Sequence, residues 1–172
     1  MARKSKPVWQ VGDRIDHLLG IERELRALLD QRLKPWGLTF AQLSLLRFIK
    51  EPKDWQDEPL SGPIRPADVA HHFRFTPRTV TEALNRLTPY IAKSIHPKDK
   101  RSVCLGLTSK GDAAIANTRA AIERTNQDVF GDLYRRHDET LWFALPAIRN
   151  RIKTARELDG PQVMGVARKG CR

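Results

Sequence analysis

The sequence has 172 residues, a formal charge of +11 at pH 7 and an isoelectric point near 10.2. This length allows one substantial core with some additional helices, and the charge favours a polyanionic partner over a basic one. No run of about 18 apolar residues occurs and no apolar signal region follows the basic N-terminus, so we expect a cytoplasmic protein with no membrane span. The two cysteines do not form a disulfide framework.

The N-terminal part is expected to be a short arm followed by a long helix. Residues 1–7 form a basic arm that we expect to be disordered. Apolar residues then recur three and four positions apart from Val8 to Leu33, and Pro35 ends the pattern. The apolar stripe is wide, which indicates packing against more than one neighbour. We therefore assign residues 8–35 to a helix that pairs with a second copy of the chain.

Two shorter helices follow, separated by an acidic loop. Thr39 is a suitable N-cap for a helix from Phe40 to Ile49. The segment from Glu51 to Pro63, with three prolines and several acidic or amide residues, is expected to be a loop. Ile64 and Arg65 are expected to form a short strand, and a helix from Pro66 to Phe73 comes next.

The segment from Phe75 to Leu87 has the pattern of a capped amphipathic helix. Thr76 is a suitable N-cap, and Pro77 occupies the first helical position, where its missing N–H costs nothing. The residues expected on the buried face are Val80, Ala83, Leu84 and Leu87. The residues left on the outer face are Arg78, Thr79, Thr81, Glu82, Asn85 and Arg86. These side chains can hydrogen-bond base edges and phosphates, so we interpret the segment as a recognition helix.

Each outer residue has a specific expected role. Arg78 can donate two hydrogen bonds to a guanine, and the methyl group of Thr81 can contact a thymine. Glu82 can accept a hydrogen bond from a cytosine amino group, or it can instead stabilise the positive end of the helix dipole. Asn85 and Arg86, one turn later, are expected to hold phosphates.

A basic hairpin is expected after this helix. Tyr90 to Ile95 and Ser102 to Leu107 are predicted strands, in which Val103 and alternate residues face the core. The connecting loop, residues 96–101, contains Lys98, Asp99, Lys100 and Arg101. Arg101 is expected to enter a narrow minor groove, while Lys98 and Lys100 either contact phosphates or are simply solvated. Asp99 is expected to brace Arg101 or to cap the turn.

The C-terminal part is expected to contain two helices. One runs from Ser109, behind the N-cap Thr108, to about Tyr134. The other runs from about Asp138 to Leu158, with a kink at Pro146. Residues 159–172 are expected to be disordered. Because the terminal helices carry more apolar surface than the central module can cover, we expect a homodimer.

Other candidate sites have weaker support. His17 and Trp36 are candidates for a pocket that binds a small aromatic effector, although such a histidine is more often a partly buried polar residue and such a tryptophan more often a packing residue. Cys104 can be a redox-sensitive thiol, but its strand position favours a passive one. The adjacent His71 and His72 point to different sides of a helix, so we predict no metal site. No paired carboxylates, activated nucleophile or phosphate-binding glycine loop occurs, so we predict neither an enzyme nor a cofactor.

Several strings in this order of elements resemble the MarR family of winged helix-turn-helix regulators. They are Leu38-Thr39-Phe40-Ala41-Gln42-Leu43-Ser44-Leu45-Leu46, Thr76-Pro77-Arg78-Thr79-Val80-Thr81-Glu82-Ala83-Leu84, and the Asp99-x-Arg101 wing leading to Leu107-Thr108-Ser109-Lys110-Gly111. The resemblance spans about residues 8–158. It implies a homodimer held by the first and last helices, with recognition helices in successive major grooves of a palindromic site and wing arginines in the flanking minor grooves. The chain departs from the family pattern at Thr88-Pro89, where the usual glycine is missing.

The predicted fold is therefore mainly α with a small β-hairpin wing. A winged helix-turn-helix module, residues 36–110, is flanked by dimerisation helices in residues 8–35 and 111–158. The predicted function is that of a homodimeric, sequence-specific double-stranded DNA-binding transcriptional regulator, a repressor that responds to a ligand. The alternative is a winged-helix interaction module that binds RNA or a protein partner without reading sequence.

Overall fold

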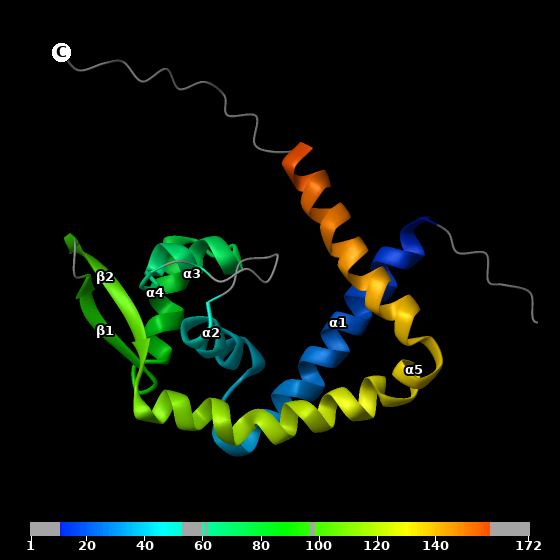
Figure 1. Ribbon diagram of the computed structural model, residues 1–172, viewed down its shortest axis with the longest axis horizontal. Helices are drawn as coiled ribbons and strands as arrows, with labels where there is room; N and C mark the ends of the chain where they lie inside the picture. Colours follow the sequence, from blue (N-terminus) through cyan, green and yellow to red (C-terminus); the bar gives the residue numbers. More distant parts are fainter. Residues whose placement is uncertain (1–10, 53–59, 61, 97–98, 159–172) are drawn as a thin grey trace, which may run out of the picture. The chain divides into compact units, whose positions relative to one another are not determined.

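The computed structural model describes residues 11–52, 60, 62–96 and 99–158 (Figure 1). In chain order the elements are α1 (Val11–Leu33), the 3-10 helix η1 (Lys34–Trp36), α2 (Phe40–Lys50), α3 (Pro66–Phe73), α4 (Pro77–Arg86), β1 (Ile91–His96), β2 (Asp99–Leu107) and α5 (Ser109–Leu158). The chain divides into two compact units after Thr125, within α5. The first unit contains every element except the remainder of α5. The predicted fold class, mainly α with a β-hairpin, is confirmed.

The helix starts follow the caps expected from the sequence. The Thr39 hydroxyl accepts a hydrogen bond from the amide of Gln42, and the Gln42 side chain accepts one from the Thr39 amide at 2.9 Å, which is a complete capping box. The Thr76 hydroxyl accepts from the amide of Thr79 at 3.2 Å. These bonds satisfy amides that have no partner within the helix, which is why α2 and α4 begin where the sequence predicted.

The C-terminal part differs from the prediction, because α5 is one continuous helix. We expected an interruption between Tyr134 and Asp138, but these residues lie within α5. The stretch contains neither glycine nor proline, so nothing in the backbone stops the helix there. Pro146 also lies inside α5, and the kink expected at that position remains a prediction.

The two strands form an antiparallel hairpin whose pairing extends further than predicted. Ile91 pairs with Leu107, and the register continues to the Ile95–Val103 pair, after which it shifts so that His96 faces Asp99. The predicted loop of residues 96–101 is therefore mostly strand. Polar residues are compatible with this pairing because one side of an antiparallel hairpin can face solvent. The predicted strand before α3 is reduced to a single bridge between Ile64 and Leu105.

The core lies between the helices of the module and the base of the hairpin. Its buried members include Leu46, Val69, Val80, Leu84, Leu87, Ile91 and Leu105. The expected alternation along β2 is wrong near the wing, since Val103 is 43% exposed whereas Cys104 is buried. Burial therefore does not alternate strictly along β2, because the neighbours Cys104 and Leu105 are both buried while Val103 is exposed. The burial of Cys104 agrees with a passive thiol.

A network of short contacts joins the hairpin to the start of α5. The Thr108 hydroxyl donates to the Pro89 carbonyl at 2.9 Å and accepts from the Gly111 amide at 3.2 Å. The Thr108 amide donates to the carbonyl of Tyr90 at 3.0 Å. Gly111 is so close to this carbonyl that a Cβ atom would lie 2.3 Å from the Tyr90 oxygen. The Leu-Thr-x-Lys-Gly string therefore has a structural role, which is to fix the base of the wing against α5.

The turn between α3 and α4 is built around a left-handed residue. Arg74 has φ 58 and ψ 36, and its amide donates to the Ala70 carbonyl. The Phe75 amide donates to the same carbonyl at 3.0 Å, and the Phe75 ring stacks on Phe73 with centroids 5.5 Å apart. This is a helix-ending arrangement in which glycine is common, because a left-handed conformation costs other residues about 1–2 kcal/mol.

Candidate nucleic-acid interface

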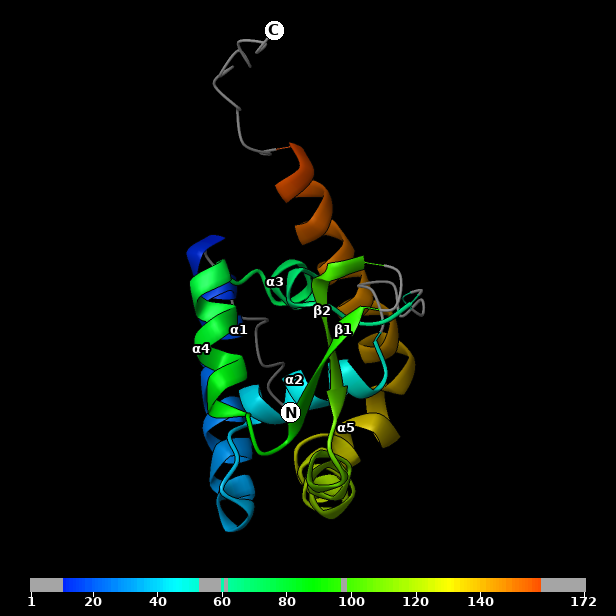
Figure 2. The ribbon, with the colours of Figure 1, turned by 90° about the vertical axis from the view of Figure 1, so that its left-hand side faces the viewer.

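Helix α4 separates buried and exposed residues as the sequence predicted. Val80 and Leu84 are buried, at 2% and 3% exposure, and point into the core. The six predicted contact residues, Arg78, Thr79, Thr81, Glu82, Asn85 and Arg86, are all exposed on the remaining surface of the helix. Val80 and Leu84 of α4 share one buried core with Ile91 of β1 and Leu105 of β2, so the helix and the wing belong to one module. Figure 2 shows α4 and the hairpin of β1 and β2 from the same side.

Local bonds set the orientation of the side chains on this surface. The Arg78 Nε donates to Glu82 Oε1 at 3.0 Å, in a pair whose side chains are 89% and 53% exposed. The Thr81 hydroxyl donates to the Pro77 carbonyl at 3.0 Å. Its hydrogen is thus used within the helix, which leaves the methyl group available for an apolar contact. Glu82 lies in the second turn of α4 and pairs with a cation, which weakens the helix-dipole alternative, because dipole effects fade beyond the first turn.

The described part of the wing presents positive charge. Lys100 and Arg101 are exposed in β2. Lys98 lies outside the described residues. Asp99 begins β2, but its side chain is outside the described ones, so its role as a brace for Arg101 stays a prediction.

A shallow pocket places the start of α2 beside α4. It has a volume of about 260 Å³ and includes Thr39 and Gln42 from α2 with Thr79, Glu82 and Arg86 from α4. Sequence reasoning did not connect these two helices. The N-cap predicted at Thr39 marked where α2 begins, but no pattern indicated that this end would lie against the recognition helix.

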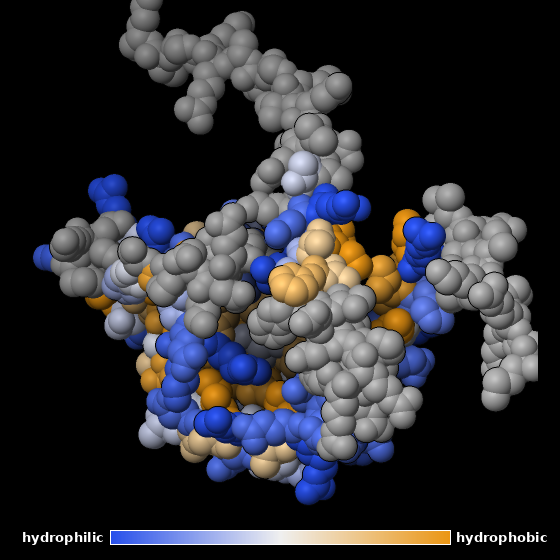
Figure 3. Space-filling model, turned by 45° about the vertical axis from the view of Figure 1, so that its right-hand side comes forward, coloured by the Kyte–Doolittle hydropathy of each residue, from blue (hydrophilic) through white to orange (hydrophobic). Residues whose placement is uncertain are grey.

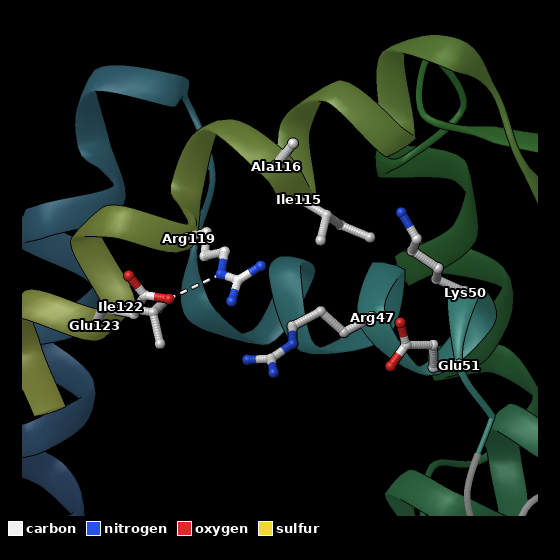
Figure 4. Close-up of a pocket in the computed structure, with 8 residues that line it drawn as sticks. All are labelled: Arg47, Lys50, Glu51, Ile115, Ala116, Arg119, Ile122 and Glu123. Atoms are coloured by element: carbon white, nitrogen blue, oxygen red, sulfur yellow. Dashed lines mark hydrogen bonds and ion pairs between the residues drawn. The ribbon is translucent and has the colours of Figure 1, made fainter.

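A larger pocket lies between α2 and the first part of α5. Its volume is about 550 Å³, and its lining residues are Arg47, Lys50, Glu51, Ile115, Ala116, Arg119, Ile122 and Glu123. In Figure 4 the Arg119 side chain points from α5 toward α2, whereas the Arg47 side chain lies over α2. Arg119 donates to Glu123 at 2.7 Å, and the hydrogen bond and charge of Glu123 raise the pKa of Arg119 above its ordinary value. Lys50 pairs with Asp112 at 2.8 Å.

The two residues proposed for an effector pocket do not come together within one chain. His17 is exposed on α1, and Trp36 is half-buried in η1. The helical stretch from His17 to Leu33 alone covers about 24 Å at 1.5 Å per residue. Neither residue lines the pocket between α2 and α5. A site that used both would need residues from two chains.

Large apolar side chains remain exposed on helices in both units. On α1 they are Ile15, Leu18, Leu19 and Ile21, and on the later part of α5 they are Phe143, Leu145, Ile148 and Ile152. Apolar and charged residues share the surface shown in Figure 3. Among the described helices, none is long and apolar enough to cross a membrane.

The arrangement of α2, α3, α4 and the hairpin is a winged helix-turn-helix module. No protein-family profile matches the chain, and no curated protein matches it. Solved structures do match. They include the transcriptional regulator SlyA, with a TM-score of 0.69, 19% identity, and coverage of 85% of this chain and 98% of that chain. The MepR–DNA complex from S. aureus matches with a TM-score of 0.65 and 18% identity over 83% of this chain and 98% of that chain.

A mutant of MarR from E. coli complexed with operator DNA gives a TM-score of 0.66 and 20% identity, covering 83% of this chain and 99% of that chain. The chain therefore has the winged helix-turn-helix fold of MarR, SlyA and MepR, as the sequence resemblance predicted. At these identities the match concerns the fold.

Proposed function

We propose that the protein is a MarR-family transcriptional regulator that binds double-stranded DNA as a homodimer and represses transcription until a small molecule binds. The observation that carries the proposal is the exposed surface of α4, whose six predicted contact residues are all accessible beside a basic wing. In this arrangement Arg78, Thr79, Thr81 and Glu82 would read base edges, while Asn85 and Arg86 would hold phosphates. The DNA-bound structures of proteins with the same fold, MepR and MarR, support this use of the module.

The wing would act next to the recognition helix. Lys98 and Lys100 would contact phosphates, and Arg101 would enter the minor groove, where the negative potential favours a guanidinium group. Asp99 would hold Arg101 in position. If a dimer neutralised on the order of eight phosphates, the logarithm of the binding constant would fall with the logarithm of salt concentration with a slope near −7.

A homodimer would cover the apolar side chains that α1 and α5 leave exposed. Ile15, Leu18 and Leu19 occur three and four positions apart, so they share one side of α1. Burying such side chains contributes roughly 1.5–3 kcal/mol each when the burial is complete. A palindromic DNA site follows from two-fold pairing of identical reading modules.

The effector would bind the pocket between α2 and α5. Arg47 supplies a guanidinium group, and Ile115 and Ile122 supply apolar surface. The other two cations of the lining, Lys50 and Arg119, are paired with Asp112 and Glu123. A small aromatic acid suits this combination, because its carboxylate can pair with a guanidinium while its ring covers the apolar side chains. Effector binding would favour one spacing of the two recognition helices over another. Because the two spacings would bind DNA with different affinities, the effector would change the affinity for DNA. His17 and Trp36 remain candidates for a site shared between two chains.

The proposal is tested by selecting bound duplexes from a random pool at about 0.15 M salt, and repeating the selection with aromatic acids present. We expect a palindromic sequence to emerge. Arg78→Ala should then lose about 1–3 kcal/mol of discrimination at one base position in each half-site. Arg124→Ala serves as a control, since this exposed arginine lies on α5 and outside the reading module.

Equal binding of random and selected duplexes, or a strictly monomeric protein, would refute the proposal. Binding to RNA or to a protein partner, with no preference among duplexes, would support the alternative of an interaction module without sequence readout.

A further inference from the structure

Asp30, near the end of α1, is bonded to the first residue of α2. Its Oδ1 atom accepts a hydrogen bond from the Phe40 amide at 2.5 Å, across ten residues of sequence, and the contact is partly buried. Because Phe40 begins α2, its amide has no acceptor within that helix. The local N-cap serves a different amide, since the Thr39 hydroxyl accepts from the Gln42 amide. Asp30 is therefore a second cap for α2, and it is supplied by another helix.

The part of α1 that holds Asp30 is packed firmly within the same compact unit. Leu33, three residues further along, is fully buried at 0% exposure. Arg32 donates to the Thr125 hydroxyl of α5 at 3.1 Å, and Thr125 is itself buried. In the other direction, about 18 Å of continuous helix separate Asp30 from the exposed apolar Leu18, at 1.5 Å per residue. A displacement of α1 at Leu18 is thus carried along the helix to Asp30.

On its other side, the bond from Asp30 leads to the recognition helix. Leu45 and Leu46 of α2 belong to the same buried core as Val80 and Leu84 of α4. The start of α2 also borders α4 in the shallow pocket that Thr39 lines. Closely packed side chains transmit a displacement to their neighbours, so α4 follows α2 when α2 moves. The contacts therefore run from α1 through Asp30 to α2, and from α2 to α4.

We propose that Asp30 is a positioning residue for DNA binding, which fixes the separation of the two recognition helices in a dimer by bonding the start of α2 to α1. The inference rests on the proposed function, in which α1 pairs with a second copy of the chain and α4 reads DNA. Each half of a palindrome is then read by an α4 that is held against the dimerisation helix through α2 and Asp30. Asp30 itself does not contact DNA, and its effect is on how sharply the protein selects the spacing of the two half-sites.

The competing explanation is a purely structural role. A carboxylate that accepts an amide in the first turn of a helix stabilises that helix. In that role, the loss of Asp30 lowers the stability of the protein and weakens binding to every duplex by the same factor. In the positioning role, the loss weakens binding most for the duplex with the preferred spacing, because an altered spacing is better tolerated. The ratio of the affinities for two spacings separates the two roles.

The test uses the full-length protein and two duplexes, the palindrome selected above and the same palindrome with one base pair inserted at its centre. The insertion moves one half-site by about 3.4 Å and turns it by about a tenth of a helical turn. The unmodified protein should prefer the first duplex. In Asp30→Ala and Asp30→Gln the ratio of the two affinities should fall about fivefold or more, the lower end of ordinary coupling between distant sites. The salt slope and the preferred bases should not change, because the contacts within each half-site stay the same.

Two further variants complete the test. Asp30→Asn should keep most of the spacing preference, because asparagine retains an oxygen acceptor at the same distance from the backbone. Glu24→Ala is the matched control, since it removes an exposed carboxylate from α1 and should leave the ratio unchanged. Circular dichroism reports the folding of every variant.

An unchanged ratio in both Asp30→Ala and Asp30→Gln would overturn the inference, and a lower thermal midpoint alongside it would assign Asp30 to helix stability alone. An unmodified protein that bound the two spacings equally well would also overturn it. If the unmodified protein bound no duplex or stayed monomeric, the proposed function would fail first and the inference with it.

Discussion

Replacing Gly111 by alanine should destabilise the protein, although alanine is the better helix former. A Cβ atom at this position would lie 2.3 Å from the Tyr90 carbonyl oxygen and 3.3 Å from the Leu107 Cβ. The nearer atom belongs to the backbone, so it cannot move aside as a flexible side chain can. The segment that holds Tyr90 also accepts the amide of Thr108 at 3.0 Å, and a shift large enough to remove the clash would disturb that bond.

The expected loss of stability is the balance of opposing contributions to the free energy of unfolding. Overpacking in a closely packed site costs about 1–3 kcal/mol, and weakening a hydrogen bond adds about 1 kcal/mol. The higher helix propensity of alanine returns about 1 kcal/mol. The net expectation is a loss of about 2 kcal/mol in the free energy of unfolding, which corresponds to a fall of about 4–8 °C in the thermal midpoint for a chain of this size.

Thermal and urea unfolding, followed by circular dichroism, measure this loss. The matched control is Gly106→Ala, since no atom lies within 4 Å of a Cβ built at Gly106. Gly106 has no positive φ, so its replacement should leave stability unchanged or slightly raised. If Gly111→Ala were as stable as Gly106→Ala, the close contact with Tyr90 would not exist in solution, and the anchoring of the wing through Thr108 would be wrong.

Two further substitutions test the recognition helix and the dimer. Thr76→Ala removes the hydroxyl that accepts a hydrogen bond from the Thr79 amide at 3.2 Å, so the urea midpoint should fall by the equivalent of about 1 kcal/mol in the free energy of unfolding. The control is Thr81→Ala, which removes a hydroxyl that bonds within α4 and should have a smaller effect. Equal effects of the two substitutions would contradict the capping role of Thr76. Leu18→Glu places a charge on the exposed apolar side of α1, which should shift a dimer toward monomer in light-scattering measurements. Arg26→Ala on the same helix should leave the dimer intact. If the Leu18→Glu protein stayed dimeric, Leu18 would not belong to the interface.

The parts of the fold that could be predicted are those decided by short-range chemistry. Thr39, Thr76 and Thr108 each accept the hydrogen bond expected of an N-cap, because a hydroxyl three residues before an amide needs no distant partner. The buried and exposed sides of α4 were predictable for the same reason, since helical periodicity assigns each residue to one side.

The remainder depends on contacts between segments that are far apart in sequence. Nothing in the sequence near Cys104 distinguishes it from Val103, yet Cys104 is buried and Val103 is 43% exposed. The pocket that includes Arg47 and Arg119 forms because α2 and α5 face one another, and charged residues on two separate helices give no indication of that pairing. The continuity of α5 was missed for a different reason: its residues allow a helix throughout, but their apolar pattern weakens near Tyr134.

The ion pair between Arg78 and Glu82 bears on how the proposed recognition helix could read DNA. Both side chains are exposed, and such a surface pair contributes about 0–1 kcal/mol. A bidentate contact between arginine and guanine is worth about 1–3 kcal/mol of discrimination, so a matching base can outcompete the pair. Once Arg78 turns to a guanine, Glu82 gains free acceptor capacity, which a cytosine amino group could use. The pair would therefore hold both side chains on the outer surface of α4 in the free protein while giving way to a cognate site.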